Sequence, residues 1–566
     1  MTSIQQKIKN NLSAPGLAIF FIVLGGFVLR VWGVNFGLPL LYHPDEPTFV
    51  RIAMHFGTGD LNPHWFGNPG NVFMYFLFFC YGLVYLAGYI FGLFPNPEAF
   101  VEYYRSSPTI FYLTGRMTEV VLSTASIYLV YKIAVLLKNR TAGLAAALFL
   151  ATSPMHVEHS KYVRIDIMSA FFVLLAVFYC LRLLDSKKRI HYLAAGAGAG
   201  LALAAKYPTG AVIATVIFAF MLAGWEKFFN EKDKENRTIY QAVVFLRSRF
   251  FDRDFILGSF SILAAFAVTT PFFFIDFKNA VHDLLYEVGT SHVGGEKRSL
   301  LASLWWYAAG PLREEGMNGV IEILALGGMI WLLKEKNKKA WIAFSFFAIY
   351  SFIVGLAASQ FSRWIIPLLP FLAIFAGVCI AQIFSLAAKM TTRRRPAPAA
   401  LAGIIVALIF PQILQCIDGN HEFTRPDTRQ FCKTWVEQTL PPNSRIAQEE
   451  YTYLPTSESS YLLGDIEVNG FYIYQRITLA DSSFEYYQKN GFDYILISSW
   501  GYRRFGQIEP YRKFYEDLFQ QSQLIKVFQA EEKKIVGPEI KVFKISAATL
   551  DGGIGAGVNG PGNSKH

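Results

Sequence analysis

The sequence predicts a polytopic α-helical membrane protein with a C-terminal extracytoplasmic α/β domain. The chain of 566 residues is 53% hydrophobic and only 17% charged, with a mean hydropathy of +0.32. Long apolar segments recur along most of its length, and short basic clusters separate them. After about residue 418 the composition becomes polar, and helix and strand signals alternate. This composition excludes an ordinary soluble enzyme.

The first apolar segment, residues 15–34, is long enough to cross a bilayer as a helix. Lys7 and Lys9 precede it, and the bulky residues Phe36 and Leu38 follow it. A secretory signal would have a shorter apolar core and a cleavage site of small residues. We therefore interpret the segment as a retained membrane helix.

Further apolar segments bring the expected number of spans to about eleven. They cover residues 110–137, 141–157, 167–184, 191–205, 208–225, 255–274, 316–333, 341–357, 364–386 and 399–416.

The basic clusters predict the orientation of these spans. If the spans alternate, the clusters at 138–140, 187–189, 334–339 and 393–395 all lie on the side of the N-terminus, which is therefore expected in the cytoplasm. Segment 72–94 is also apolar enough to cross, but counting it would reverse every later cluster. We expect it instead to lie in, or dip into, the outer interface. The net charge of +10 thus indicates membrane orientation and not nucleic-acid binding.

The expected organisation is a transmembrane domain, an outer α/β domain and a disordered Gly-rich tail. These parts cover residues 1–417, 418–550 and 551–566. The transmembrane domain contains a first outer loop with interfacial helices (35–109), a cytoplasmic loop (226–254) and a further outer loop (275–315). In the outer domain, Asp427 can cap a helix and residues 494–498 are typical of a buried strand.

Two acidic loops fall on the predicted outer side. HPDEP, residues 43–47, places Asp45 and Glu46 just beyond the first span, and EHSKYVRID, residues 158–166, ends in Asp166. Charge near a membrane is costly and is commonly functional. The alternative is that these acids only start helices, since carboxylates and an early proline both favour helix N-termini.

Basic residues fall on the same side. Lys206 and Arg363 stand at the outer ends of spans, and Lys161 and Arg164 lie in the second acidic loop. Ammonium and guanidinium groups there can hold a phosphate at the level of the lipid headgroups. The alternative is that Lys206 snorkels and Arg363 anchors its span at the interface.

Several blocks, in this order, resemble those of C-type (GT-C) glycosyltransferases, in particular the protein O-mannosyltransferase and aminoarabinose transferase group (glycosyltransferase family 39-like). The blocks are HPDEP, NPGNVFMYFLFF, YLTGRMTEVVLS, SPMHVEHSKYVRIDIMSAFF, LALAAKYPTGA and SRWIIPLLPFLAIFAG. The resemblance covers residues 17–380 and, more weakly, the outer domain through VGPEIKVFKI.

The resemblance implies an enzyme that moves a sugar from a polyprenyl-phosphate carrier to an acceptor outside the cytoplasm. Its catalytic acid in the first outer loop matches Asp45, with Glu46 beside it, and its second-loop acid matches Asp166. The basic residue near the following pair of spans matches Lys206, and His292 in a later outer loop is a weaker match.

These residue types suit direct displacement at an anomeric carbon. A carboxylate, for which we choose Asp45, can take the acceptor's proton, and one base without a covalent intermediate predicts inversion. The leaving phosphate needs charge neutralisation, which Lys206 and Arg363 can supply. The candidate set is completed by Arg164 and Lys161 for the phosphate, and by His43, His159 and Tyr162 nearby.

A divalent metal ion is a possible cofactor, with Asp45, Glu46, Asp166 and His159 as candidate ligands. The sequence identifies neither the sugar nor the acceptor. A transporter or flippase is the alternative function, although transporters commonly place their polar sites near the bilayer midplane, whereas these charges are at the outer ends of spans.

Overall fold

The structure is a computed structural model that describes residues 14–67, 70–228, 239–289, 298–390, 398–453 and 464–545. The chain divides into two compact units. The first comprises Met1–Pro39 and His43–Thr424, and the second comprises Leu40–Tyr42 and Arg425–His566. The tail at 551–566 lies outside the described residues.

The first unit is a bundle of apolar helices of different lengths. They are α2 (Ala14–Val31), α4 (Asn71–Ile90), α6 (Thr109–Leu137), α7 (Arg140–Ala151), α9 (Ile165–Ser186), α10 (Arg189–Ala205), α11 (Val212–Phe228), α13 (Arg253–Thr269), α17 (Gly319–Lys334), α18 (Ala340–Leu356), α19 (Leu369–Met390) and α20 (Pro398–Glu422).

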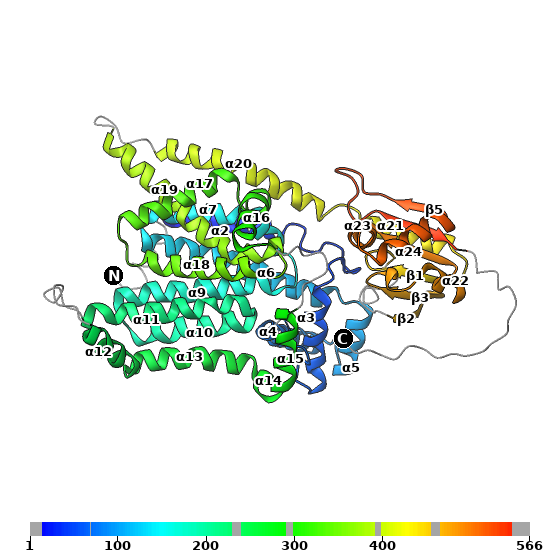
Figure 1. Cartoon of the computed structure of the whole chain (residues 1–566), viewed down its shortest axis with the longest axis horizontal. Helices are drawn as coiled ribbons and strands as arrows, with labels where there is room; N and C mark the ends of the chain where they lie inside the picture. The colour runs from blue at the N-terminus through cyan, green and yellow to red at the C-terminus, as the bar shows by residue number, and fades with distance from the viewer. Residues whose placement is uncertain are drawn as a thin grey trace. The chain divides into compact units, whose positions relative to one another are not determined.

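Shorter helices connect them. They are α3 (Glu46–His55), α5 (Pro97–Ser106), α8 (Pro154–His159), α12 (Ile239–Phe250), α14 (Pro271–Ile275), α15 (Phe277–Gly289), α16 (Leu300–Tyr307), the wide turn η4 (Ala308–Gly316) and the 3-10 turns η1 (Phe56–Thr58), η2 (Tyr207–Ala211) and η5 (Ser362–Leu368). In Figure 1, α3 stands across one end of the bundle, whereas α9, α10 and α11 run side by side along it.

The chain is a multi-pass membrane protein. Within the described residues, 6 helices are long and apolar enough to cross a membrane, or 7 if the bent pair Leu300–Gly316 and Gly319–Lys334 is one span. Three shorter apolar helices, including Ala340–Leu356, could complete spans only with help from flanking residues. The expected total of about eleven spans therefore stays a prediction. So does the interfacial placement of segment 72–94, because α4 is one of the 6.

Prolines divide two segments that the sequence predicts as continuous spans. Residues 141–157 form α7 and then α8, which begins at Pro154, and residues 255–274 form α13 and then α14, which begins at Pro271. Proline lacks the amide proton that a helix interior needs, but it fits the first turn of a new helix.

Small residues let α10 pack closely against α13. A β-carbon on Gly196 would lie 2.1 Å from the carbonyl oxygen of Gly258, and one on Gly200 would lie 2.3 Å from that of Ile262. Glycines four residues apart therefore form the contact face of α10, as expected for helices packed within a membrane.

The second unit contains a six-stranded sheet in the order β2-β3-β1-β4-β6-β5. Strands β3, β1 and β4 are parallel, and the outer pairings are antiparallel. The strands are β1 (Arg445–Glu449), β2 (Gly464–Val468), β3 (Phe471–Arg476), β4 (Tyr494–Ser498), β5 (Gln523–Phe528) and β6 (Ile540–Lys544).

Helices cover both faces of this sheet, so the central strand β4 is buried throughout. Val436 of α21 (Thr428–Thr439) packs in one apolar cluster, and Phe484 of α22 (Phe484–Lys489) and Phe514 of α24 (Tyr511–Gln521) pack in the other. The Asp427 side chain caps α21 by accepting a hydrogen bond from the Arg429 amide, which confirms the predicted cap.

Candidate active site

A cavity of about 840 Å³ lies in the first unit, where helix ends meet. Of the candidate residues, it brings together Asp45, Arg164, Asp166, Lys206 and Arg363. Asp45 precedes α3, Arg164 and Asp166 flank the start of α9, Lys206 follows α10, and Arg363 lies in η5.

These five side chains form a line of alternating charge. Arg363 Nη2 lies 4.0 Å from Asp45 Oδ2, and Arg164 Nη2 lies 3.1 Å from the same oxygen. On its other side, Arg164 Nε lies 3.5 Å from Asp166 Oδ2, and Asp166 Oδ1 accepts a hydrogen bond of 2.5 Å from Lys206 Nζ. Arg164 therefore joins the two acidic loops.

The two carboxylates differ in exposure. The Asp45 side chain is 42% exposed, whereas that of Asp166 is 3% exposed. Neither acts as a helix cap through its side chain: the start of α3 has no side-chain cap bond, and neither has the start of α9. Asp166 is held by two cations, and Asp45 presents its carboxylate to the cavity.

Lys206 is buried beside Asp166. Burial lowers the pKa of its ammonium group, and the Asp166 carboxylate opposes that effect. The ion pair thus keeps a charge in a place where an isolated ammonium would tend to lose its proton.

The rest of the cavity wall is largely apolar. It is lined by residues from α18 and η5, among them Ile353, Val354, Leu356 and Trp364, and by Trp65 from the loop before α4. The cavity thus has a charged side and a side suited to a hydrocarbon chain.

Glu46 is not among the residues that line this cavity. It is fully buried, and Arg116 of α6 donates to both of its carboxylate oxygens, at 2.8 and 2.7 Å. Oε1 also accepts a hydrogen bond from the Val163 amide. Glu46 therefore fixes the second acidic loop against α6 and the start of α3.

The Lys161 side chain, like that of Glu46, does not line the cavity. Its Nζ donates to Asn420 Oδ1 of α20 at 2.7 Å and to the carbonyl oxygen of Val157 at 3.3 Å. Burial lowers the pKa of this ammonium group to about 7. Lys161 therefore connects α8 and α20 and does not line the cavity.

The aromatic and histidine candidates contact one another beside Arg164 and do not line the cavity. His43 Nε2 lies 3.4 Å from Arg164 Nη1. The His43 ring is tilted by 44° to the Tyr162 ring with their centroids 4.4 Å apart, and Tyr162 also contacts the ring of His159. Burial and nearby cations hold the pKa of His43 well below its usual value, and burial lowers that of His159 to about 3. His292 lies outside the described residues.

The predicted metal ligands do not meet as a set. In the part of the chain that the structure describes, the His, Cys, Asp and Glu groups whose donor atoms converge are His55, Asp60 and His64, which do not include Asp45, Glu46, Asp166 or His159. Within the charged line, Arg164 and Lys206 already hold the oxygens of Asp45 and Asp166.

Sequence reasoning missed Arg116, Tyr350 and Glu287. Arg116 stands in the block YLTGRMTEVVLS, where an arginine within an apolar span is itself a signal. Tyr350 and Glu287 line the cavity from α18 and α15, but nothing in their local sequence distinguishes them from packing or surface residues.

Comparisons with known proteins agree with this architecture. Residues 113–246 match the family described as dolichyl-phosphate-mannose-protein mannosyltransferase. No curated protein sequence matches the chain.

Solved structures of similar fold cover nearly the whole chain. ArnT from Cupriavidus metallidurans in the apo state is 15% identical with a TM-score of 0.50, covering 94% of this chain and 98% of its own. The Archaeoglobus fulgidus oligosaccharyltransferase in the apo form is 12% identical with a TM-score of 0.53, covering 95% of this chain and 75% of its own. The chain therefore has the fold of the C-type (GT-C) membrane glycosyltransferases, which confirms the resemblance seen in its sequence blocks.

Proposed function

We propose that the protein transfers a sugar from a polyprenyl-phosphate carrier to an acceptor outside the cytoplasm. The observation that carries this proposal is that a partly exposed carboxylate, three cations and an apolar wall meet in one cavity. Each has a counterpart in the reaction: the acceptor hydroxyl, the phosphate and the prenyl chain.

Asp45 is the proposed general base. As the acceptor oxygen bonds to the anomeric carbon, its proton passes to the Asp45 carboxylate. The bond from that carbon to the phosphate oxygen breaks at the same time, and its electron pair leaves with the phosphate. Arg164 Nη2 lies 3.1 Å from Asp45 Oδ2 and holds the carboxylate in position to accept the proton. A single displacement of this kind inverts the anomeric centre.

Arg363 and Lys206 are the proposed phosphate ligands. They stand at the two ends of the charged line, and Arg363 is 30% exposed. Cations already in place where the phosphate gains charge lower the barrier without reorganisation. Asp166 is then a positioning residue, because its carboxylate pairs with both Lys206 and Arg164 and so orients them.

This assignment puts the end of the bundle that carries Asp45 on the extracytoplasmic side, with the N-terminus in the cytoplasm. The acceptor can be a protein, lipid or glycan, because the reaction needs only a nucleophile.

The proposal is tested with purified protein in nanodiscs and a panel of polyprenyl-phospho-hexoses and polyprenyl-phospho-pentoses. We expect release of polyprenyl phosphate, measured by mass spectrometry, that depends on an acceptor fraction from the cell envelope. Movement of an intact substrate across vesicles, without release of polyprenyl phosphate from any donor, would favour a transporter instead.

A further inference from the structure

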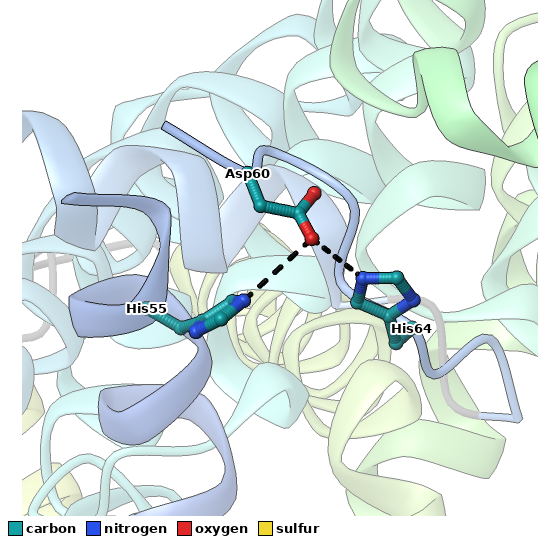
Figure 2. Close-up of side chains that lie close together, drawn as sticks. All are labelled: His55, Asp60 and His64. Carbon is teal, nitrogen blue, oxygen red and sulfur yellow. Dashed lines mark hydrogen bonds and ion pairs between the residues drawn. The ribbon is translucent and has the colours of Figure 1, made fainter. Parts of the chain in front are cut away.

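A second cluster of ligand-type side chains lies outside the charged line, at the end of α3. His64 Nε2 lies 2.8 Å from Asp60 Oδ2, and His55 Nε2 lies 3.7 Å from the same oxygen. Figure 2 shows the two imidazole rings below this oxygen, one on its left and one on its right, each with a ring nitrogen directed at it. All three side chains are exposed.

The loop that carries Asp60 and His64 is organised by its own side chains. Asp60 Oδ1 accepts a hydrogen bond from the Asn62 amide, and Asn62 Oδ1 accepts one from the His64 amide. Asp60 thus uses one oxygen to shape the loop and directs the other at the imidazoles. His64 has a φ of 51°, a left-handed conformation that few non-glycine residues adopt.

We propose that His55, Asp60 and His64 bind a divalent transition metal ion, with Zn²⁺ the best fit. Zinc binds imidazole nitrogen and carboxylate oxygen at about 2.0 to 2.2 Å, which makes the edge of its tetrahedron about 3.3 Å long. The two ligand distances, 2.8 and 3.7 Å, lie on either side of that length. Two imidazoles disfavour Mg²⁺ and Ca²⁺, which prefer oxygen ligands.

The ion would replace the hydrogen bond between His64 and Asp60, and water would complete its coordination because the site is open to solvent. It would join the last residue of α3 to the loop that follows. That loop is already held on its other side, where Asn62 donates to Asp276 at 3.0 Å and the Phe66 amide donates to Asp283 at 2.9 Å.

This site would stiffen one wall of the cavity. Asp45 immediately precedes α3, His55 ends it, and Trp65, the residue after His64, lines the cavity. Metal binding would therefore fix the helix that follows Asp45 to the loop that carries Trp65. The binding itself does not depend on the proposed transfer reaction.

The test uses full-length protein purified with a tag that contains no histidine, stripped with a chelator and dialysed against Zn²⁺. We expect about one Zn²⁺ per chain by elemental mass spectrometry, with affinity reduced at least tenfold in His55→Ala and in His64→Asn. Asparagine tolerates the left-handed backbone at position 64, so the second variant preserves the loop. The control is His282→Ala, which removes an exposed histidine beside Asp283 outside the cluster.

A thermal unfolding midpoint that Zn²⁺ raises in wild type and His282→Ala, but not in His55→Ala or His64→Asn, would support the site. The proposal is overturned if stripped wild type takes up no Zn²⁺. It is equally overturned if the double variant His55→Ala/His64→Asn binds Zn²⁺ as wild type does.

Discussion

Removing the charge of Glu46 should damage the fold rather than the chemistry. Glu46 and Arg116 are both fully buried and joined by two hydrogen bonds of 2.8 and 2.7 Å. Arg116 also donates to the carbonyl oxygens of Val34 and Phe36, each at 2.8 Å. The pair therefore holds three parts of the chain together: the segment after α2, the start of α3, and α6.

The substitution Glu46→Gln leaves a buried guanidinium without a counter-ion. Breaking a buried pair in this way costs about 3 to 5 kcal/mol, because the stranded charge keeps its desolvation penalty. Adding Arg116→Met removes that charge, and the glutamine can still accept from the Val163 amide. The double variant should therefore lose less stability than the sum of the single variants, with a coupling of about 0.5 to 3 kcal/mol.

The assay compares thermal unfolding midpoints at one scan rate in detergent with transfer activity per folded protein. Glu102→Gln is the control, since Glu102 and its partner Arg105 are largely exposed and their pair contributes little. The reasoning is refuted if Glu46→Gln unfolds at the wild-type temperature yet loses turnover, because Glu46 would then act in the chemistry.

Three further predictions follow from the geometry. Lys206→Met should lower kcat/KM for the lipid-linked donor on the order of 10²-fold, as measured by initial rates, because a cation facing the phosphate is lost. Burial raises the pKa of Glu449 from 4.5 to about 7. The protonated side chain therefore contributes about 3 kcal/mol to the free energy of unfolding. This contribution is complete below pH 4.5 and is lost as the pH rises through 7. Hydrogen exchange of β1 and β4 should therefore quicken between pH 5 and 8 after correction for intrinsic rates, and Glu449→Gln should abolish that change. Gly196→Val should destabilise the bundle by about 1 to 3 kcal/mol in thermal unfolding, whereas Gly25→Val, where a β-carbon meets nothing within 4 Å, should not.

The helices of the bundle could be predicted because apolar length is a local property of the sequence. Each predicted span overlaps a helix of the structure, and the basic clusters at 138–140, 187–189 and 334–339 lie at the ends of helices. Sequence reasoning missed the helix breaks at Pro154 and Pro271. The residues around each proline are so apolar that the whole segment is predicted as one continuous span. The strand at 494–498 and the cap at Asp427 depend on neighbouring residues alone, and both are confirmed.

The site could be predicted only in part, because adjacent residues in sequence can point to different places. Asp45 and Glu46 are neighbours, yet Asp45 lines the cavity and Glu46 turns into the bundle to meet Arg116. Lys161 and Arg164 lie in the same loop, yet Lys161 bonds to Asn420 away from the cavity whereas Arg164 pairs with Asp45 in it. Which of two adjacent charges finds a buried partner depends on contacts between distant segments, and one sequence does not reveal them.

The most direct test of the account is sugar transfer by Asp45→Asn. The wild-type protein and this variant are compared in nanodiscs with a polyprenyl-phospho-sugar that supports turnover, measuring both release of polyprenyl phosphate and the anomeric configuration of the product. We predict an inverted product from wild type and a loss of about 10² to 10⁴-fold in kcat for Asp45→Asn, with an unchanged unfolding midpoint. Full activity in the variant, or a product of retained configuration, would contradict the assignment of Asp45 as the base of a single displacement.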